Sequence, residues 1–381
     1  MGYIKNTIQF IKERFNSNEM IPLHAPLFAG NERAYIADTL DSTFVSSVGA
    51  YVDKSEVMMT TITHTSKAVA VVNGTAGLQV AMQLAGVGKG EEVITQALTF
   101  VATANAIVHS GAAPIFLDVD KETMGLSPEA VSNFLQEFGE KRDAKVFNKK
   151  TGKRIAACVP MHTFGFPVNL DELIAICEEW NIPIVEDAAE SLGSYYKGKH
   201  TGAFGMLGVF SFNGNKIVTC GGGGMIVTQK EDLGKLGKHL TTTAKVPHPY
   251  EFVHDYVGYN FRMPNLNAAL LCGQLEQLPE FLNKKRELAA AYALFFKGEG
   301  VKFREELAHT RVNYWLMCLE LEDKTERDAF LIETNKNGVM TRPIWQLMHR
   351  LPMYKDCFRD AQINAEYLES RIVNIPSSVI L

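Results

Sequence analysis

Cysteine is scarce in this sequence, with six residues in 381, at positions 158, 177, 220, 272, 318 and 357. No two of them have CxxC spacing, and no cluster of cysteine and histidine has the spacing of zinc ligands. Neither a disulfide framework nor a metal site is therefore predicted. A chain of this length can bury enough apolar surface to fold without such links. Unpaired thiols are typical of a reducing compartment, so we expect a cytoplasmic protein.

An excess of charge is also missing, because 38 Lys and Arg stand against 43 Asp and Glu, a net charge of −5. The basic domain that marks nucleic-acid binding is absent, and 46% apolar content argues against long disorder. The longest segment without charged residues, Val93–Leu117, contains Gln96, Asn105 and His109. A bilayer helix would have to bury these polar groups in hydrocarbon, so no membrane span is predicted.

The pattern that is present alternates short apolar runs with helical segments from about residue 68. Apolar runs, rather than alternation of apolar and polar residues, are typical of parallel strands that are covered on both faces. The predicted strands are 67–72, 92–96, 113–119, 155–162 and 183–189, and the predicted helices are 76–87, 99–111 and 170–180. An α/β fold with a mostly parallel sheet is therefore expected.

After about residue 250 the pattern changes to helical segments at 265–297 and 325–338, with extended segments at 313–321 and 339–345. We therefore divide the chain into a larger α/β domain, 1–255, and a smaller α+β domain, 256–381. The larger domain includes an N-terminal segment, 1–20, whose apolar residues recur at helical spacing.

Two candidate functional places lie at the ends of predicted strands, where open α/β sheets bind ligands. The run Asn73-Gly74-Thr75-Ala76 joins a strand to a helix, and small residues there let an anion approach the helix N-terminus. An ordinary N-cap by Thr75 is the alternative. The strand at 183–189 ends in Glu186-Asp187, which is either a functional carboxylate or a structural pair of acids.

A third place is Lys216, which lies in an uncharged stretch and is followed by four glycines, Gly221 to Gly224. Burial lowers the pKa of a lysine and makes its amine nucleophilic toward carbonyl groups. The glycines do not fit a dinucleotide or P-loop fingerprint, which argues against a nicotinamide enzyme, and we expect them to let the backbone pass close to the lysine. A phosphate cradle, an acid and an isolated lysine together match pyridoxal phosphate, whose enzymes use a Schiff-base lysine and an Asp partner for the ring nitrogen.

Five runs carry a resemblance to a known family: 73–78 (NGTAGL), 99–107 (TFVATANAI), 185–194 (VEDAAESLGS), 210–216 (FSFNGNK) and 258–270 (GYNFRMPNLNAAL). In this order they resemble the DegT/DnrJ-type sugar aminotransferases, which have the aspartate-aminotransferase fold, fold type I of the pyridoxal-phosphate enzymes. The opening segment 22–49 looks more particularly like the 4-aminotransferases of legionaminic-acid and bacillosamine pathways, which serve surface polysaccharides.

The resemblance implies a role for each matching residue. Lys216 matches the Schiff-base lysine, Asp187 the partner of the ring nitrogen, and Phe100 the aromatic that stacks on the ring. The remaining matches are Gly74, Thr75, Ala76 and Ser211 for the phosphate, Asn260 for the phosphate of the neighbouring subunit in a homodimer, and Ser46, His162, Lys245 and Arg262 around the sugar nucleotide. Phe100 taken alone is more often a core residue, His162 is equally a structural histidine, and Lys245 and Arg262 are equally surface charges.

Glu190 stands where many relatives have Gln or His, which can donate a hydrogen bond to the phenolic oxygen of the cofactor. An ionised Glu only accepts hydrogen bonds. We therefore expect Glu190 to be protonated, or turned away with water between it and the cofactor.

The resemblance implies transamination from glutamate, through a pyridoxamine phosphate form, to C4 of a nucleotide-linked 4-keto-6-deoxy sugar. The expected sugar is UDP-linked and carries a 2-acetamido group. A GDP-perosamine synthase-like enzyme, which acts on a GDP-linked keto sugar, is the alternative. A non-catalytic sugar-nucleotide sensor is a weaker alternative, because Asp187, Ser211 and Lys216 are all present.

Overall fold

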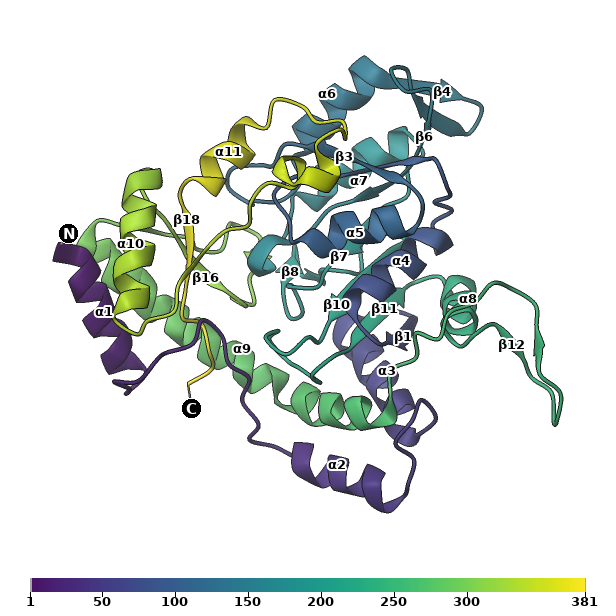
Figure 1. The fold of residues 1–381 in the computed structure, drawn as a ribbon, viewed down its shortest axis with the longest axis horizontal. Coiled ribbons are helices and arrows are strands. Elements are labelled where there is room, and N and C mark those ends of the chain that lie inside the picture. The colour runs from purple at the N-terminus through teal and green to yellow at the C-terminus, as the bar shows by residue number, and fades with distance from the viewer. Residues whose placement is uncertain (1, 381) are drawn as a thin grey trace.

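A central sheet organises the computed structural model, which describes residues 2–380 (Figure 1). Its strands lie in the order β3, β2, β6, β7, β10, β11, β1, with β6 and β7 joined by the parallel bridges Cys158–Ile184 and Met161–Asp187. Only β11 runs against its neighbours in this series. The expected mostly parallel sheet is therefore confirmed. The strands are β1 Lys67–Val71, β2 Glu92–Gln96, β3 Ala113–Leu117, β6 Arg154–Val159, β7 Val185–Asp187, β10 Leu207–Ser211 and β11 Gly224–Thr228.

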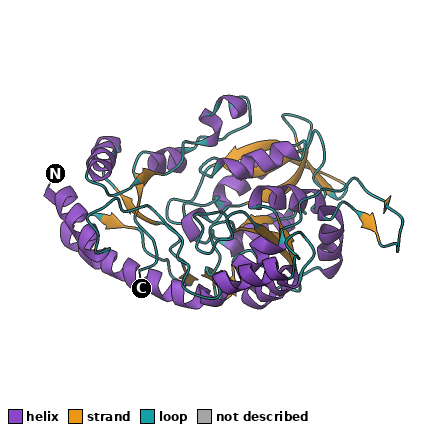
Figure 2. Ribbon diagram, turned by 60° about the horizontal axis from the view of Figure 1, so that its bottom comes forward, coloured by secondary structure: helices purple, strands orange, loops and turns teal. Residues whose placement is uncertain are grey.

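Helices cover both faces of this sheet, because successive residues of a strand point to opposite sides and both sides are apolar. Val69 and Val71 of β1 pack with α4 and α5, whereas Ala68 and Ala70 belong to the core on the other face. Figure 2 shows the strands between the helical layers. The helices of this region are α2 Glu32–Asp41, α3 Ala50–Thr63, α4 Gly74–Leu84, α5 Val101–His109, α6 Pro128–Phe138, α7 Leu170–Glu179 and α8 Glu231–Thr241, with the 3-10 turn η1 Thr163–Gly165.

A long helix, α9 (Asn265–Glu299), runs from α2 and α3 to a second, smaller sheet (Figure 1). That sheet has the strand order β14, β16, β18, β17 and is entirely antiparallel. Its strands are β14 Lys302–Phe303, β16 Met317–Glu320, β17 Arg342–Pro343 and β18 Ile372–Ile375. The helices of this region are α10 Lys324–Lys336, η2 Met348–Arg350, η3 Pro352–Tyr354 and α11 Ile363–Glu369. None of the helices within residues 2–380 is long and apolar enough to cross a bilayer.

The N-terminal helix α1 (Gly2–Arg14) packs on the C-terminal region. The division predicted from the sequence had assigned it to the larger domain, 1–255. Tyr3 stacks on Phe330 of α10, and Phe10 stacks on Phe295 of α9. The prediction of an amphipathic helix is correct, but helical spacing does not tell which surface the apolar face will cover.

Several short strands were not predicted from the sequence. They form the hairpin of β4 (Gly139–Arg142) and β5 (Lys145–Asn148), the hairpin of β12 (Lys245–Val246) and β13 (Val253–His254), and a small sheet of β8 (Tyr195–Tyr196), β9 (Lys199–His200) and β15 (Thr310–Arg311). The β12–β13 hairpin projects from the body of the molecule in both ribbon views (Figures 1 and 2).

Candidate active site

A pocket of about 630 Å³ opens where the central sheet meets the smaller sheet. Its floor comes from the ends of β1, β7 and β10 and the turn after β10, and its opposite wall comes from residues 342–346. The pocket brings together seven of the site residues expected from the sequence: Gly74, Thr75, Phe100, Asp187, Glu190, Ser211 and Lys216. Strand ends separated by many residues meet here because the strands are parallel and share one edge.

The run at the start of α4 forms a cradle for an anion. The side chain of Asn73, not Thr75, caps the helix by accepting the amide of Ala76 at 2.8 Å. The amide of Ala76 is therefore already hydrogen-bonded in the cap, and Ala76 does not line the pocket. The amides of Gly74 and Thr75 precede the first intrahelical hydrogen bond and point out of the helix start, where a phosphate is favoured.

The last glycine of the run, Gly224, packs against this cradle and not against the lysine, which corrects the expectation from the sequence. A Cβ on Gly224 would lie 2.6 Å from the carbonyl carbon of Asn73 and 2.8 Å from the amide nitrogen of Gly74. A Cβ on Gly74 would in turn meet Cβ of Ser211 at 3.0 Å. Only glycine allows these three backbone segments to lie so close together.

Asp187 lies at the end of β7 with its side chain 2% exposed. One carboxylate oxygen accepts from the hydroxyl of Thr103 at 2.6 Å, and the other accepts from the amide of Ala189 at 3.1 Å. Burial raises the pKa of Asp187, and the hydrogen bond from Thr103 opposes that rise. The carboxylate faces the pocket and can hold a cationic ring nitrogen.

Glu186, the preceding acid, is structural. It is fully buried and accepts from His162 Nε2 at 3.0 Å and from the amides of Gly202, Phe204 and Gly205. Burial alone would raise the pKa of Glu186, but these donors hold it below its ordinary value.

His162 is therefore not a substrate contact. Its side chain is fully buried, with Nε2 on Glu186 and Nδ1 accepting the amide of Val168 at 3.3 Å. Both ring nitrogens are engaged, and His162 does not line the pocket. The structural reading of this histidine replaces the substrate role that the resemblance implied.

Lys216 projects into the pocket from the turn after β10. Its Nζ lies 3.1 Å from Oε1 of Glu190 and 3.7 Å from the ring centroid of Trp315. Glu190 accepts a second hydrogen bond from the amide of Phe164 at 2.9 Å. Burial raises the pKa of Glu190 to about 7, although the charge of Lys216 pulls it down. Glu190 is thus not turned away from the pocket, and its two carboxylate oxygens accept from Lys216 and from the amide of Phe164.

Phe100 stands at the pocket wall with 49% of its surface exposed. It precedes α5 in an extended conformation, and its ring centroid lies 6.4 Å from that of Trp345. A core residue would be covered, so this exposure favours a stacking surface for a planar ligand.

Four further residues that the resemblance implied lie outside the pocket. Ser46, Lys245 and Asn260 are exposed, and Arg262 is half-buried. Arg262 donates to the side-chain oxygen of Asn260, and it shares a shallow surface hollow with Lys245. The main chain of Arg262 pairs with Val71 at the end of β1, which holds this segment next to the cradle strand. A single protomer does not bring these residues into the pocket.

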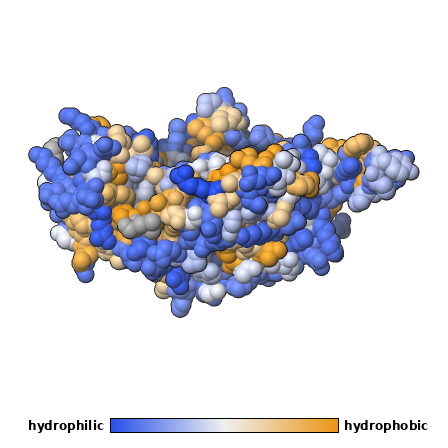
Figure 3. All heavy atoms as spheres, turned by 90° about the horizontal axis from the view of Figure 1, so that it is seen from below, coloured by the Kyte–Doolittle hydropathy of each residue, from blue (hydrophilic) through white to orange (hydrophobic). Residues whose placement is uncertain are grey.

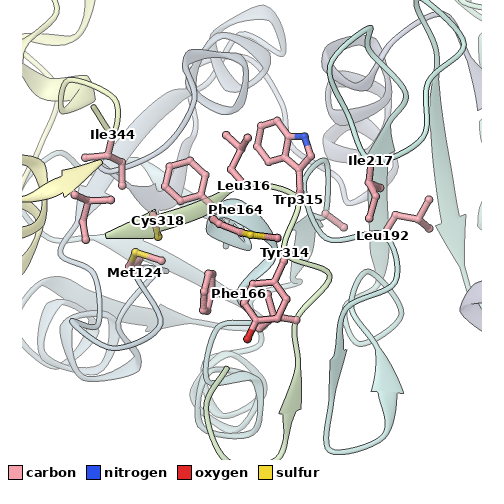
Figure 4. Close-up of a cluster of buried hydrophobic side chains, with 14 of the residues drawn as sticks. Met124, Phe164, Phe166, Leu192, Ile217, Tyr314, Trp315, Leu316, Cys318 and Ile344 are labelled. Atoms are coloured by element: carbon pink, nitrogen blue, oxygen red, sulfur yellow. The ribbon is translucent and has the colours of Figure 1, made fainter. Parts of the chain in front are cut away.

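The sequence reasoning missed the contribution of the C-terminal region. Trp315 donates its indole N–H to the carbonyl of Asn215 at 2.7 Å, and Asn313 donates to the carbonyls of Glu190 and Leu192. Tyr314 has a positive φ of 50°, so the expected strand at 313–321 begins only at Met317. Figure 4 shows Trp315 and Leu316 beside Phe164. The chain has only three tryptophans, and this scarcity was the one signal in the sequence that could have drawn attention to Trp315.

These residues fit pyridoxal phosphate. The helix start and the hydroxyls of Thr75 and Ser211 suit its phosphate, Asp187 suits its ring nitrogen, and Phe100 suits its ring face. Lys216 supplies an amine with only 11% of its side chain exposed, as a carbonyl nucleophile requires. The Cβ contacts at Gly74 and Gly224 show that the cradle leaves no room for larger residues.

Comparison with known proteins agrees with this site. The profile of the DegT/DnrJ/EryC1/StrS aminotransferase family matches residues 27–381. A GDP-perosamine synthase of Escherichia coli O157:H7 is 36% identical over 94% of this chain and 93% of its own length. A GDP-perosamine synthase of Vibrio cholerae is 34% identical over 88% of each chain. The crystal structure of the aminotransferase TlmJ from Streptoalloteichus hindustanus superposes with a TM-score of 0.85 at 27% identity, over 94% and 93% of the two chains. The chain therefore belongs to the DegT/DnrJ/EryC1/StrS family of pyridoxal-phosphate-dependent sugar aminotransferases and has their fold type I architecture.

Proposed function

We propose that this enzyme transfers the amino group of glutamate to C4 of a GDP-linked 4-keto-6-deoxy sugar. The choice of GDP as the nucleotide rests on the similarity, over most of the chain, to two proteins named GDP-perosamine synthase. These relatives favour the GDP-linked substrate over the UDP-linked 2-acetamido sugar that the opening segment 22–49 suggested. Amination at C4 is the same in both readings.

The residues of the pocket divide the chemistry between them. Pyridoxal phosphate, when bound, supplies an electron sink that makes the α-proton of an amino acid acidic. Lys216 would hold the cofactor through its amine, and that amine, when displaced by the amino donor, could carry a proton between the α-carbon of the amino acid and the cofactor. Asp187 keeps a proton on the ring nitrogen, and the Gly74–Thr75 amides with Ser211 anchor the phosphate. Phe100 shields one face of the ring from water.

A homodimer with shared active sites is part of this proposal. Ser46, Lys245, Asn260 and Arg262 lie outside the pocket of their own protomer, and in a dimer they would serve the neighbouring one. Exposed apolar residues accompany them: Leu40, Phe44 and Val48 near Ser46, and Tyr250, Phe252 and Val257 near Lys245 and Asn260. Hydrophobic groups also show among hydrophilic ones on the face seen in Figure 3. Such patches are typical of interfaces.

A substrate panel tests the proposal. Purified enzyme with glutamate is offered GDP-linked and UDP-linked 4-keto-6-deoxy sugars, the latter with and without the 2-acetamido group, and the amino sugar is identified with its C4 configuration. We expect turnover of the GDP-linked sugar with release of 2-oxoglutarate. Turnover of the UDP-linked 2-acetamido sugar alone would contradict the GDP-linked substrate and support the UDP-linked substrate expected from the sequence. Release of 2-oxoglutarate without any amino sugar would reject both nucleotides.

A further inference from the structure

A chain of two buried hydroxyls ends on Asp187. Thr103 of α5 donates to Oδ2 of Asp187 at 2.6 Å, and Thr99 lies 2.9 Å from Thr103, hydroxyl to hydroxyl. Thr99 and Thr103 are both fully buried, so water does not compete for these hydrogen bonds. The Thr99 hydroxyl has two other neighbours, the sulfur of Met161 at 2.9 Å, which is a weak acceptor, and the carbonyl oxygen of Phe100 at the longer distance of 3.3 Å.

The direction of this chain follows from the number of protons. An ionised Asp187 can only accept, so the Thr103 proton points to it. The oxygen of Thr103 is then left as an acceptor, and the one proton of Thr99 must lie between the two hydroxyls, since two bare oxygens at 2.9 Å would repel each other. The donors therefore run from Thr99 to Thr103 to Asp187, and each hydrogen bond polarises the next.

We propose that this hydroxyl chain keeps Asp187 a weaker base than the ring nitrogen it faces, so that the proton stays on the nitrogen. The inference rests on the assignment of Asp187 to the cofactor ring in the proposed function. A buried carboxylate without donors becomes more basic and would take the proton for itself. The nitrogen would then be neutral and the ring a poorer electron sink. Thr99 and Thr103 do not reach the substrate and are positioning residues that act through Asp187.

The charge balance around Asp187 supports this role. Burial is the largest influence on its pKa and raises it, and the hydrogen bond from Thr103 is the largest opposing influence. The amide of Ala189 and the charge of Lys216 oppose it less. The amine of Lys216 would be engaged in holding the cofactor, whereas the hydroxyls of Thr99 and Thr103 take no part in the chemistry and stay beside Asp187.

The test locates the proton directly. Holoenzyme is loaded with pyridoxal phosphate labelled with ¹⁵N in the ring, and the nitrogen chemical shift is measured at neutral pH for the wild type, Thr103→Val, Thr103→Ser and Thr99→Val. Valine keeps the shape of threonine and removes the hydroxyl, whereas serine keeps the hydroxyl. We expect Thr103→Val to move the signal toward that of an unprotonated ring, Thr99→Val to move it less in the same direction, and Thr103→Ser to restore it.

A matched control is Thr95→Val. Thr95 is equally buried, but its hydroxyl donates to the carbonyl of Val159 and does not touch Asp187. This variant should leave the nitrogen signal unchanged. In Thr103→Val the single-turnover rate with glutamate should fall roughly ten-fold or more, as expected for loss of a hydrogen bond to a charged group, while KM for glutamate changes little.

The inference is overturned if Thr103→Val binds the cofactor and shows the wild-type nitrogen signal, or if Thr95→Val moves it as much. If Thr103→Val does not load with cofactor, an unchanged signal in Thr99→Val overturns it equally. An unprotonated nitrogen in the wild type would reject the role of Asp187 itself. Failure of the sugar panel would leave the nitrogen signals unaffected, so the substrate proposal and this inference can fail separately.

Discussion

The amine of Lys216 lies 3.7 Å from the centre of the Trp315 ring, so a residue of the C-terminal region contacts the nucleophile of the large domain. The indole N–H also donates to the carbonyl of Asn215, next to Lys216 in the chain. Trp315 thereby holds both the lysine and the turn that carries it.

Removal of the Trp315 ring should slow the reaction. A cation–π contact is worth about 0.5–2 kcal/mol, which corresponds to roughly 2- to 30-fold in rate if it positions the reacting amine. We expect Trp315→Leu to lower kcat in this range, and Trp315→Phe, which keeps a ring but loses the N–H, to lower it less. Equal rates in both variants and the wild type would show that the contact does not position Lys216.

Replacement of Lys216 by Ala or Arg should abolish turnover and leave the fold intact. The amine supplies both the nucleophile and the proton carrier, and proton transfer alone contributes about 10²–10⁴-fold. Circular dichroism checks the fold, and borohydride reduction followed by peptide mapping should place the label on residue 216 of the wild type only. Lys235→Ala, on the exposed face of α8, is the control and should keep full activity. Full activity in Lys216→Ala would reject the assignment.

Glu190 should make stability depend on pH in the cofactor-free protein. Burial raises its pKa from 4.5 to about 7, so between these values the folded state holds a proton that the unfolded state has released. Stability then falls as the pH rises from about 4.5 to 7. Glu190→Gln should remove this dependence, so that the difference in Tm between the variant and the wild type grows from pH 5 to pH 8 in favour of the variant.

The same variant tests the role of Glu190 in the loaded enzyme. If Glu190 is protonated there, Gln can replace it as a donor, so activity should persist and the pH titration of the cofactor absorbance should move little. A large loss of activity would show that an ionised Glu190 is required.

His162→Ala should damage stability and not substrate binding. It leaves the buried Glu186 without its side-chain donor, and a hydrogen bond to a charged group is worth about 1.5–3 kcal/mol. Denaturant unfolding should show a loss in that range, whereas KM for the sugar nucleotide should stay near the wild-type value. A raised KM with unchanged stability would restore the substrate role implied by the family resemblance.

Gly224→Ala should weaken cofactor binding, because its Cβ would overlap the backbone of Asn73 and Gly74. Gly222→Ala is the matched control two residues earlier, since its Cβ would meet only the carbonyl oxygen of Val72, at 3.8 Å. Fluorescence titration of the cofactor-free proteins with pyridoxal phosphate should give a higher Kd for the first variant only. Similar values for both would mean that the cradle tolerates the displacement.

The sequence by itself determined the parallel sheet and most of the pocket floor. Buried strands such as 113–117 and 154–159 appear as apolar runs. Asp187 stands out as one of two acids at the end of an apolar strand, and Lys216 as a charge in an uncharged stretch, because such groups are costly to bury without a partner. These signals are local, since they depend on neighbours in the chain.

Only the tertiary structure decided which neighbouring residue acts and which one supports. Glu186 and Asp187 are equivalent in sequence, yet alternation along β7 turns one toward His162 and the other toward Thr103 and the pocket. The far wall of the pocket and the docking of α1 on α10 and α9 were equally invisible. Contacts between segments hundreds of residues apart depend on packing of whole surfaces, and no local pattern in the chain specifies them.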